Sequence, residues 1–165
     1  MLYYLIASIL IAVTALFART KRAVLAAGIL FYAVQIAAAG LLLWGGLYDT
    51  TSAAFFTFDA LGTLFYLLLV VVSMYVFGHS EAYLQGEDLR SYRLYFALLM
   101  LLTTAIAGAY FANNLAVTWI FLEATTLCSA GIIYHRRTAQ ALEAAWKYVF
   151  VCSTGIAMAY LGILL

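Results

Sequence analysis

Six long apolar stretches, separated by five short polar breaks, make up almost the entire chain. A helix needs about 20 predominantly apolar residues to cross the hydrocarbon core of a bilayer. The pattern therefore predicts six membrane-spanning helices, approximately over Leu2–Ala18, Ala23–Tyr48, Ala60–Tyr83, Leu94–Ala112, Leu115–Tyr134 and Leu142–Leu165. Because the break between the fourth and fifth stretches is only Asn113 and Asn114, these two helices should form an antiparallel hairpin.

The composition indicates that the solvent of these helices is lipid. Of the 165 residues, 68% are hydrophobic and 9% are charged, and the mean hydropathy is +1.06. A soluble domain of this length has too little interior to hide so many apolar side chains. The predicted fold class is an all-α integral membrane protein. The net charge of +1, without a basic or aromatic motif, argues against nucleic acid as a partner.

Basic residues are concentrated in alternate breaks. The first, third and fifth breaks contain Arg19, Lys21, Arg22, Arg90, Arg93, Arg136 and Arg137, whereas the second and fourth contain no Lys or Arg. With alternating helices the basic breaks fall on one side of the membrane, which the positive-inside rule makes cytoplasmic. We therefore expect the N-terminus and Leu165 to lie outside the cytoplasm. No basic residue precedes the first stretch, so we interpret it as a helix and not as a cleaved signal peptide.

Two charged residues lie well inside predicted spans. Glu123 is near the centre of the fifth, and Lys147 lies roughly 15 Å beyond Arg137 if the sixth is helical. Each charge costs about 2.5–3.5 kcal/mol at the centre of a span unless it faces protein or water. An ion pair between Glu123 and Lys147 across the two antiparallel helices fits this geometry. Glu143, four residues before Lys147, is a second candidate partner, and Thr126 is an auxiliary candidate near Glu123.

Two interpretations of these charges remain open. They form either a structural ion pair that locks two helices together or a proton relay, since acids and amines inside membranes usually mark ion pathways. Three further polar residues have simpler explanations. His79 should lie near the cytoplasmic interface, where an interfacial role is favoured over proton entry. Asp59 should cap the third helix, and Gln35 should make an interhelical hydrogen bond.

A resemblance to a known family follows from the C-terminal half of the chain. NNLAVTWIFLEATTLCSAGIIYHRR and ALEAAWKYVFVCSTGIAMAYLGI resemble the antiporter-like membrane subunits of complex I and group 4 hydrogenases. The segments EATTL and ALEAAWKY are most similar to hydrogenase-4 component F, and the segment FDALGTLFYLLLVVVSMYVFGHSEAYL resembles the family's third helix. The resemblance implies a proton-translocating subunit in which Glu123 matches the fifth-helix glutamate and Lys147 the sixth-helix lysine.

The same resemblance implies that the chain is incomplete. The family's subunits have about fourteen helices that include inverted repeats, and the glutamate works there with a lysine on a broken seventh helix. The chain stops after the sixth, so we expect either a fragment of a longer gene or a split subunit. Residues 1–93 would hold the first three helices and a cytoplasmic loop. Residues 94–165 would begin the antiporter-like repeat.

The expected function is proton or cation translocation in an NADH dehydrogenase-like or hydrogenase complex of the plasma membrane. Redox chemistry would belong to peripheral partner subunits, because the chain has no haem, flavin, quinone or iron–sulfur motif. Cys128 and Cys152 lack the spacing of a metal site, so no cofactor or metal is expected. The alternatives are a structural scaffold subunit, a fragment without independent activity, and a small six-helix transporter. The choice between H⁺ and Na⁺ stays open.

Overall fold

The structure, a computed structural model, describes residues 2–44, 50–52 and 55–165, and six α-helices dominate this part of the chain. They are α1 (Leu2–Phe17), α2 (Lys21–Trp44), α3 (Ala60–Tyr83), α4 (Leu89–Phe111), α5 (Leu115–Ile133) and α6 (Ala139–Leu164). The helices α2 to α6 are long and apolar enough to span a membrane, whereas α1, with 16 residues, is shorter. The chain is therefore a helical membrane protein, as the hydropathy pattern predicts.

Several helices begin or end a few residues away from the predicted bounds. The apolar pattern follows the depth of the membrane, but a helix continues into the polar interface. This is why α4 begins at Leu89 and not at Leu94, and α6 at Ala139 and not at Leu142. Thr138 fixes the start of α6, because its hydroxyl accepts a hydrogen bond of 3.1 Å from the Ala141 amide. Residues 45–48 of the predicted second span lie outside the described residues.

A short β-hairpin stands in the second break, where the sequence predicts only a polar connection. The strands β1 (Thr50–Ser52) and β2 (Phe56–Phe58) pair antiparallel, with Thr51 opposite Thr57. The Phe55 carbonyl accepts a hydrogen bond of 2.8 Å from the Asn113 amide, in the turn between α4 and α5. The hairpin therefore holds the α4–α5 turn, and α4 and α5 form the predicted antiparallel pair.

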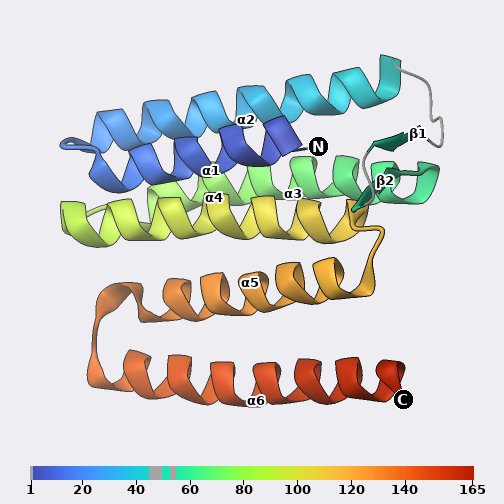
Figure 1. Cartoon of the computed structure of the whole chain (residues 1–165). Coiled ribbons are helices and arrows are strands. Elements are labelled where there is room, and N and C mark those ends of the chain that lie inside the picture. The colour runs from blue at the N-terminus through green and yellow to red at the C-terminus, as the bar shows by residue number, and fades with distance from the viewer. Residues whose placement is uncertain (1, 45–49, 53–54) are drawn as a thin grey trace.

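The helices run antiparallel in sequence order, so the three basic connections lie at one end and both termini toward the other (Figure 1). We call the first the basic end. This arrangement matches the alternation of basic breaks. The assignment of the basic end to the cytoplasm stays a prediction, as does the domain boundary after residue 93, which falls within α4.

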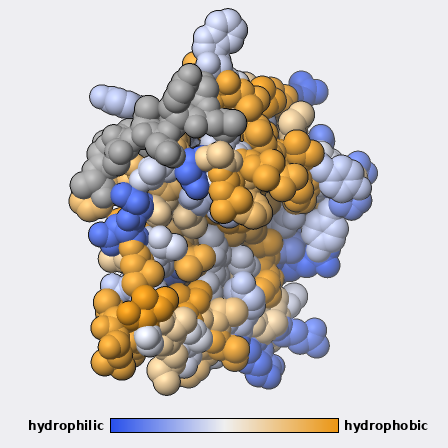
Figure 2. Space-filling model, turned by 90° about the vertical axis from the view of Figure 1, so that its right-hand side faces the viewer, coloured by the Kyte–Doolittle hydropathy of each residue, from blue (hydrophilic) through white to orange (hydrophobic). Residues whose placement is uncertain are grey.

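The core is built around α4, which packs against α1, α2, α3 and α5. Phe31, Phe77, Phe96 and Met100 form much of the interior near the basic end. By contrast α6 packs mainly against α5 and against the short connection between α5 and α6. Ala145 is the one buried residue of α6 among those described. Hydrophobic side chains lie on the outer surface of the molecule in Figure 2, as expected for a surface that faces lipid. The charged residues of α6 thus lie in the least covered layer.

Two minor predictions about polar side chains are confirmed. The Asp59 carboxylate caps α3 by accepting a hydrogen bond of 3.0 Å from the Gly62 amide. Gln35 is fully buried and accepts hydrogen bonds from the hydroxyls of Tyr4 (2.6 Å) and Tyr66 (2.7 Å) on two other helices. Both residues therefore have structural roles in the part of the bundle remote from α6.

Candidate functional site

Glu123 lies half-buried in the interface between α5 and α6. Asn114 starts α5, since its side-chain oxygen accepts a hydrogen bond of 2.8 Å from the Ala116 amide. Glu123 follows Leu115 by eight residues, so its Cα is roughly 12 Å along the helix, near the middle of the span. Across the interface the Ser153 hydroxyl of α6 donates a hydrogen bond to Glu123 Oε1, with an O–O distance of 2.5 Å.

A serine hydroxyl is a partner that serves both protonation states of a carboxyl group. It donates to a carboxylate, and by rotating about its C–O bond it accepts from a protonated acid. A lysine, which only donates, stabilises the carboxylate alone. The pair Glu123–Ser153 therefore allows the acid to gain and lose a proton without losing its interhelical contact. This property suits a group that exchanges a proton inside a membrane.

Lys147 does not form the ion pair with Glu123 that the sequence made geometrically reasonable. Its ammonium group instead contacts the Glu143 carboxylate, 2.5 Å away and four residues earlier on the same helix. The second partner considered from the sequence is thus the observed one. Both side chains are exposed, Lys147 by 72% and Glu143 by 66%.

The rotation of α6 about its own axis explains this outcome. Ser153 faces Glu123, and Lys147 precedes Ser153 by six residues. Six residues of helix correspond to a rise of roughly 9 Å and a rotation of about 240°. Lys147 is therefore nearly two turns closer to the basic end than Glu123, on a different side of α6. The sequence indicated only that both residues lie deep in their spans, and depth alone does not fix which side of a helix a residue occupies.

Neither Thr126 nor His79 forms a hydrogen bond with Glu123 in the described part of the chain. Thr126 is buried at 4% exposure, but its hydroxyl donates to the Leu122 carbonyl of its own helix (3.2 Å). His79 is exposed on α3, where its ring stacks on Tyr75 with centroids 6.4 Å apart. Since α4 packs between α3 and α5, His79 is remote from the α5–α6 interface. The structure gives His79 a surface position.

His135 is a buried polar residue that the sequence analysis passed over as part of a loop. It lies in the short helix η1 (Tyr134–Arg136) and is 6% exposed. Its Nδ1 is 2.7 Å from the Ile132 carbonyl oxygen, and its Nε2 has no hydrogen-bond partner among the described residues. Because a carbonyl only accepts, Nδ1 carries the proton in the neutral ring and Nε2 is left as a free acceptor.

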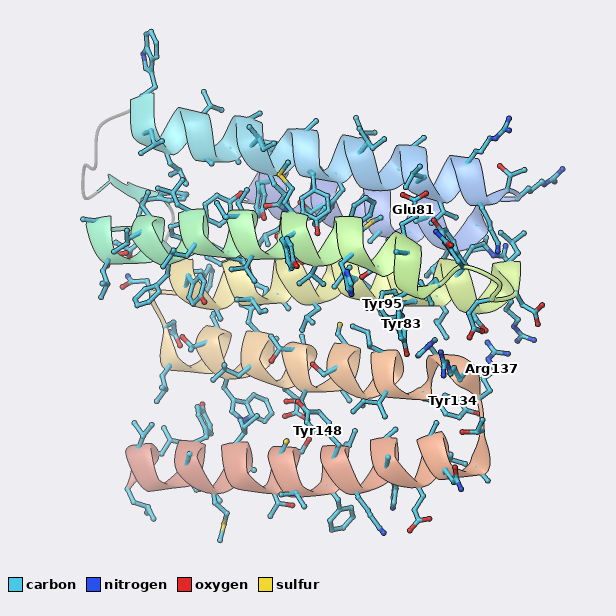
Figure 3. All side chains as sticks on the ribbon, turned by 180° about the vertical axis from the view of Figure 1, so that it is seen from behind. Glu81, Tyr83, Tyr95, Tyr134, Arg137 and Tyr148 are labelled. Carbon is cyan, nitrogen blue, oxygen red and sulfur yellow. The ribbon has the colours of Figure 1, made fainter. Side chains whose placement is uncertain are left out.

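Aromatic rings surround His135 at the basic end. The Tyr95 and Tyr83 rings lie 5.4 and 6.1 Å from its ring centroid. Figure 3 shows both tyrosines on the side of the bundle toward α5. Arg136 stacks over Tyr83 at 5.3 Å and forms an ion pair of 3.2 Å with Glu87. A lone histidine at a helix C-terminus was the available sequence signal, but its burial depends on tertiary packing.

A comparison with known proteins identifies a relative of this chain. Over 115 residues, 66% of the chain, the sequence is 30% identical to the hydrogenase-4 component F homolog of Methylacidiphilum infernorum (isolate V4). The chain is a partial homologue of that protein. The resemblance to component F noted from the sequence is thereby confirmed. The matched region covers 24% of the component F homolog, so the chain spans about a quarter of that relative's length. No family model matches the chain.

Proposed function

We propose that the chain is part of an ion-translocating membrane subunit of a hydrogenase or NADH dehydrogenase-like complex. In this proposal Glu123 is the group that exchanges a proton in the membrane. The observation that carries the proposal is the Glu123–Ser153 hydrogen bond at mid-depth between α5 and α6. Homology to hydrogenase-4 component F supports the assignment to such a complex. Its partners would be further membrane subunits and peripheral redox subunits in the plasma membrane.

Lys147 would act on Glu123 through its charge and not through contact. Over a separation on the order of 10 Å, with an effective dielectric constant of about 20, the Coulomb energy is on the order of 1–2 kcal/mol. That is about a tenfold effect on a proton equilibrium. Glu143 would control how strongly Lys147 acts on Glu123. Pairing with Glu143 neutralises the charge of Lys147, and separation of the pair restores that charge.

The test uses Glu123→Gln and Lys147→Ala in the intact membrane complex. The glutamine keeps the size and the contact with Ser153 but carries no exchangeable acid. We expect proton translocation to be abolished in Glu123→Gln and reduced about tenfold in Lys147→Ala, while the complex assembles normally. Unchanged translocation in both variants would overturn the proposal.

A scaffolding role is the second candidate. It is favoured by the ion pair that Lys147 and Glu143 form within α6, because Glu123 then has only its hydrogen bond to Ser153, which would fix how α5 and α6 align. If the chain only holds a complex together, the double replacement Glu123→Leu and Ser153→Ala should leave translocation intact. Loss of translocation with normal assembly in this double variant would instead support the relay.

A further inference from the structure

A cavity of about 300 Å³ opens at the basic end of the bundle, remote from the α5–α6 interface. Its wall is formed by the first turn of α2, the end of α3 and the start of α4. The residues used below are Lys21, Arg22, Leu25, Glu81, Leu84 and Tyr92. This volume is at the lower end of the range of about 300–1,000 Å³ for small-molecule sites.

The cavity lies where the helices leave the membrane. The α2 span begins at Lys21, and the α3 span ends at Tyr83, two residues after Glu81. The cavity is thus at the depth of lipid headgroups. Leu84 is fully buried and Leu25 partly so, and these two leucines give the polar opening an apolar side. A ligand with a charged head and an apolar body fits such a boundary.

Three charged side chains line the cavity without neutralising one another. In the described part of the chain, no ion pair involves Lys21, Arg22 or Glu81. Lys21 is held by a hydrogen bond to the Glu87 carbonyl (2.7 Å) and lies 5.5 Å above the Tyr92 ring. Since an ammonium group has three donors, two remain for a ligand. Figure 3 shows Glu81 on the side of α3 toward α2.

The positive side of the cavity suits a phosphate group. Lys21 and Arg22 are the first two residues of α2, so the positive end of the helix dipole adds to their charges. The Thr20 hydroxyl already accepts from the Ala23 amide (3.2 Å), which fixes the start of this helix. A phosphodiester at this point would receive charge-assisted hydrogen bonds from both side chains.

Glu81 places a carboxylate at the same opening, so the cavity differs from a site that binds only an anion. Glu81 would repel a purely anionic headgroup but accept hydrogen bonds from an ammonium group. We propose that this cavity binds the headgroup of phosphatidylethanolamine, with the phosphodiester at Lys21 and Arg22 and the ammonium group at Glu81. Phosphatidylcholine has a quaternary ammonium without an N–H donor, and phosphatidylglycerol has no cation, so each satisfies only part of the site. The proposal is independent of proton translocation.

The first test needs no variant. The purified full chain in detergent is mixed with phosphatidylethanolamine, phosphatidylcholine or phosphatidylglycerol of identical acyl chains, and bound lipid is counted by native mass spectrometry. We expect phosphatidylethanolamine to be retained several-fold more than either of the others. Equal retention of phosphatidylethanolamine and phosphatidylcholine would overturn the proposal. Soluble O-phosphoethanolamine distinguishes the source: if it displaces the lipid at equal concentration, the ligand is a free phosphate compound.

Matched variants then locate the site. Lys21→Gln with Arg22→Gln should lower retention of phosphatidylethanolamine about tenfold. Arg19→Gln with Arg90→Gln removes the same charge near the same end but outside the cavity lining, and retention should stay unchanged. Glu81→Gln should remove the preference for phosphatidylethanolamine over phosphatidylglycerol. An equal loss in both double variants would show general attraction to lipid and contradict a site.

Discussion

Ser153 and Glu123, thirty residues apart in the sequence, are joined by a hydrogen bond of 2.5 Å between α6 and α5. It is the contact that ties the mid-membrane acid to the outermost helix. Because the hydroxyl serves either protonation state, the contact would persist through the proton exchange that we propose for this acid. The lysine that the sequence favoured as the partner of Glu123 is on another side of α6.

The first prediction concerns this hydroxyl. Ser153→Ala should lower proton translocation in the intact complex several-fold, because the charged form of Glu123 loses a donor. It should lower the free energy of unfolding by only about 0.6–1.7 kcal/mol, the size of an interhelical hydrogen bond in membranes. Ser153→Thr, which retains the hydroxyl, should recover most of the translocation rate measured by pH-sensitive dye in proteoliposomes.

Thr154→Val is the matched control for this change. The Thr154 hydroxyl is adjacent in sequence but donates to the Phe150 carbonyl of its own helix (2.6 Å) and faces outward. Translocation should be unchanged. If Thr154→Val and Ser153→Ala reduce translocation equally, the effect arises from α6 in general and the special role of Ser153 is excluded.

The second prediction concerns the Lys147–Glu143 pair. On an exposed helix in water such an i,i+4 pair contributes about 0.3–0.5 kcal/mol. In a bilayer, Glu143→Gln leaves Lys147 charged without its partner, at a cost of about 2.5–3.5 kcal/mol. We therefore expect Glu143→Gln to destabilise the chain in lipid bicelles by that amount, and Glu143→Gln with Lys147→Met to restore most of it.

The ion pair Arg136–Glu87 offers a comparison at the end of the bundle. Arg136→Gln breaks it at a site that reaches water, so the cost should stay below about 1 kcal/mol. Free energies of unfolding in the same bicelles check both pairs. Equal small costs for Glu143→Gln and Arg136→Gln would mean that the outer face of α6 is solvated.

The sequence predicted the helices well because a membrane imposes a one-dimensional pattern. A run of apolar residues indicates that a segment lies in lipid, and the length of the run indicates whether the segment can cross the hydrocarbon core. The ends were less accurate, since the helices extend into polar residues such as Arg90 and Gln140. The hairpin of Thr50–Ser52 and Phe56–Phe58 escaped prediction because three-residue strands are too short to show an alternating pattern.

The candidate site was predictable in one respect and not in another. The cost of a charge in lipid singled out Glu123 and Lys147 from the sequence alone. The Glu143 partner was also accessible, because an i,i+4 contact within one helix needs no tertiary information. The partnership of Glu123 with Ser153 depends on how α6 is rotated against α5, and one residue of error rotates a side chain by about 100°.

The third prediction concerns the packing of α4 against α5, on which the position of Glu123 depends. A Cβ on Gly108 would lie 2.3 Å from the Phe121 ring, so the two helices approach closely at this point. Gly108→Ala should lower the free energy of unfolding by about 1–3 kcal/mol through overpacking. Gly155→Ala on α6, where a Cβ meets nothing within 4 Å, is the control and should be neutral or slightly stabilising.

Phe121→Leu shows whether the collision itself is responsible. This smaller side chain should recover part of the stability of Gly108→Ala, because it vacates the space that the new methyl group needs. A Gly108→Ala variant as stable as the parent chain, measured by thermal unfolding in the same detergent, would contradict the close approach of α4 and α5.

The last prediction concerns His135. Its Nδ1–H donates to the Ile132 carbonyl at the end of α5, and its ring packs against Tyr95. His135→Phe preserves the ring contact but removes the hydrogen bond, which should cost about 0.5–1.5 kcal/mol. The loss should be local: amide hydrogen exchange should speed up in the last turn of α5 and in η1 but not around Asn114. His79→Phe on the exposed face of α3 should leave exchange in α5 unchanged. If the two variants alter α5 equally, or neither does, His135 does not anchor the end of this helix.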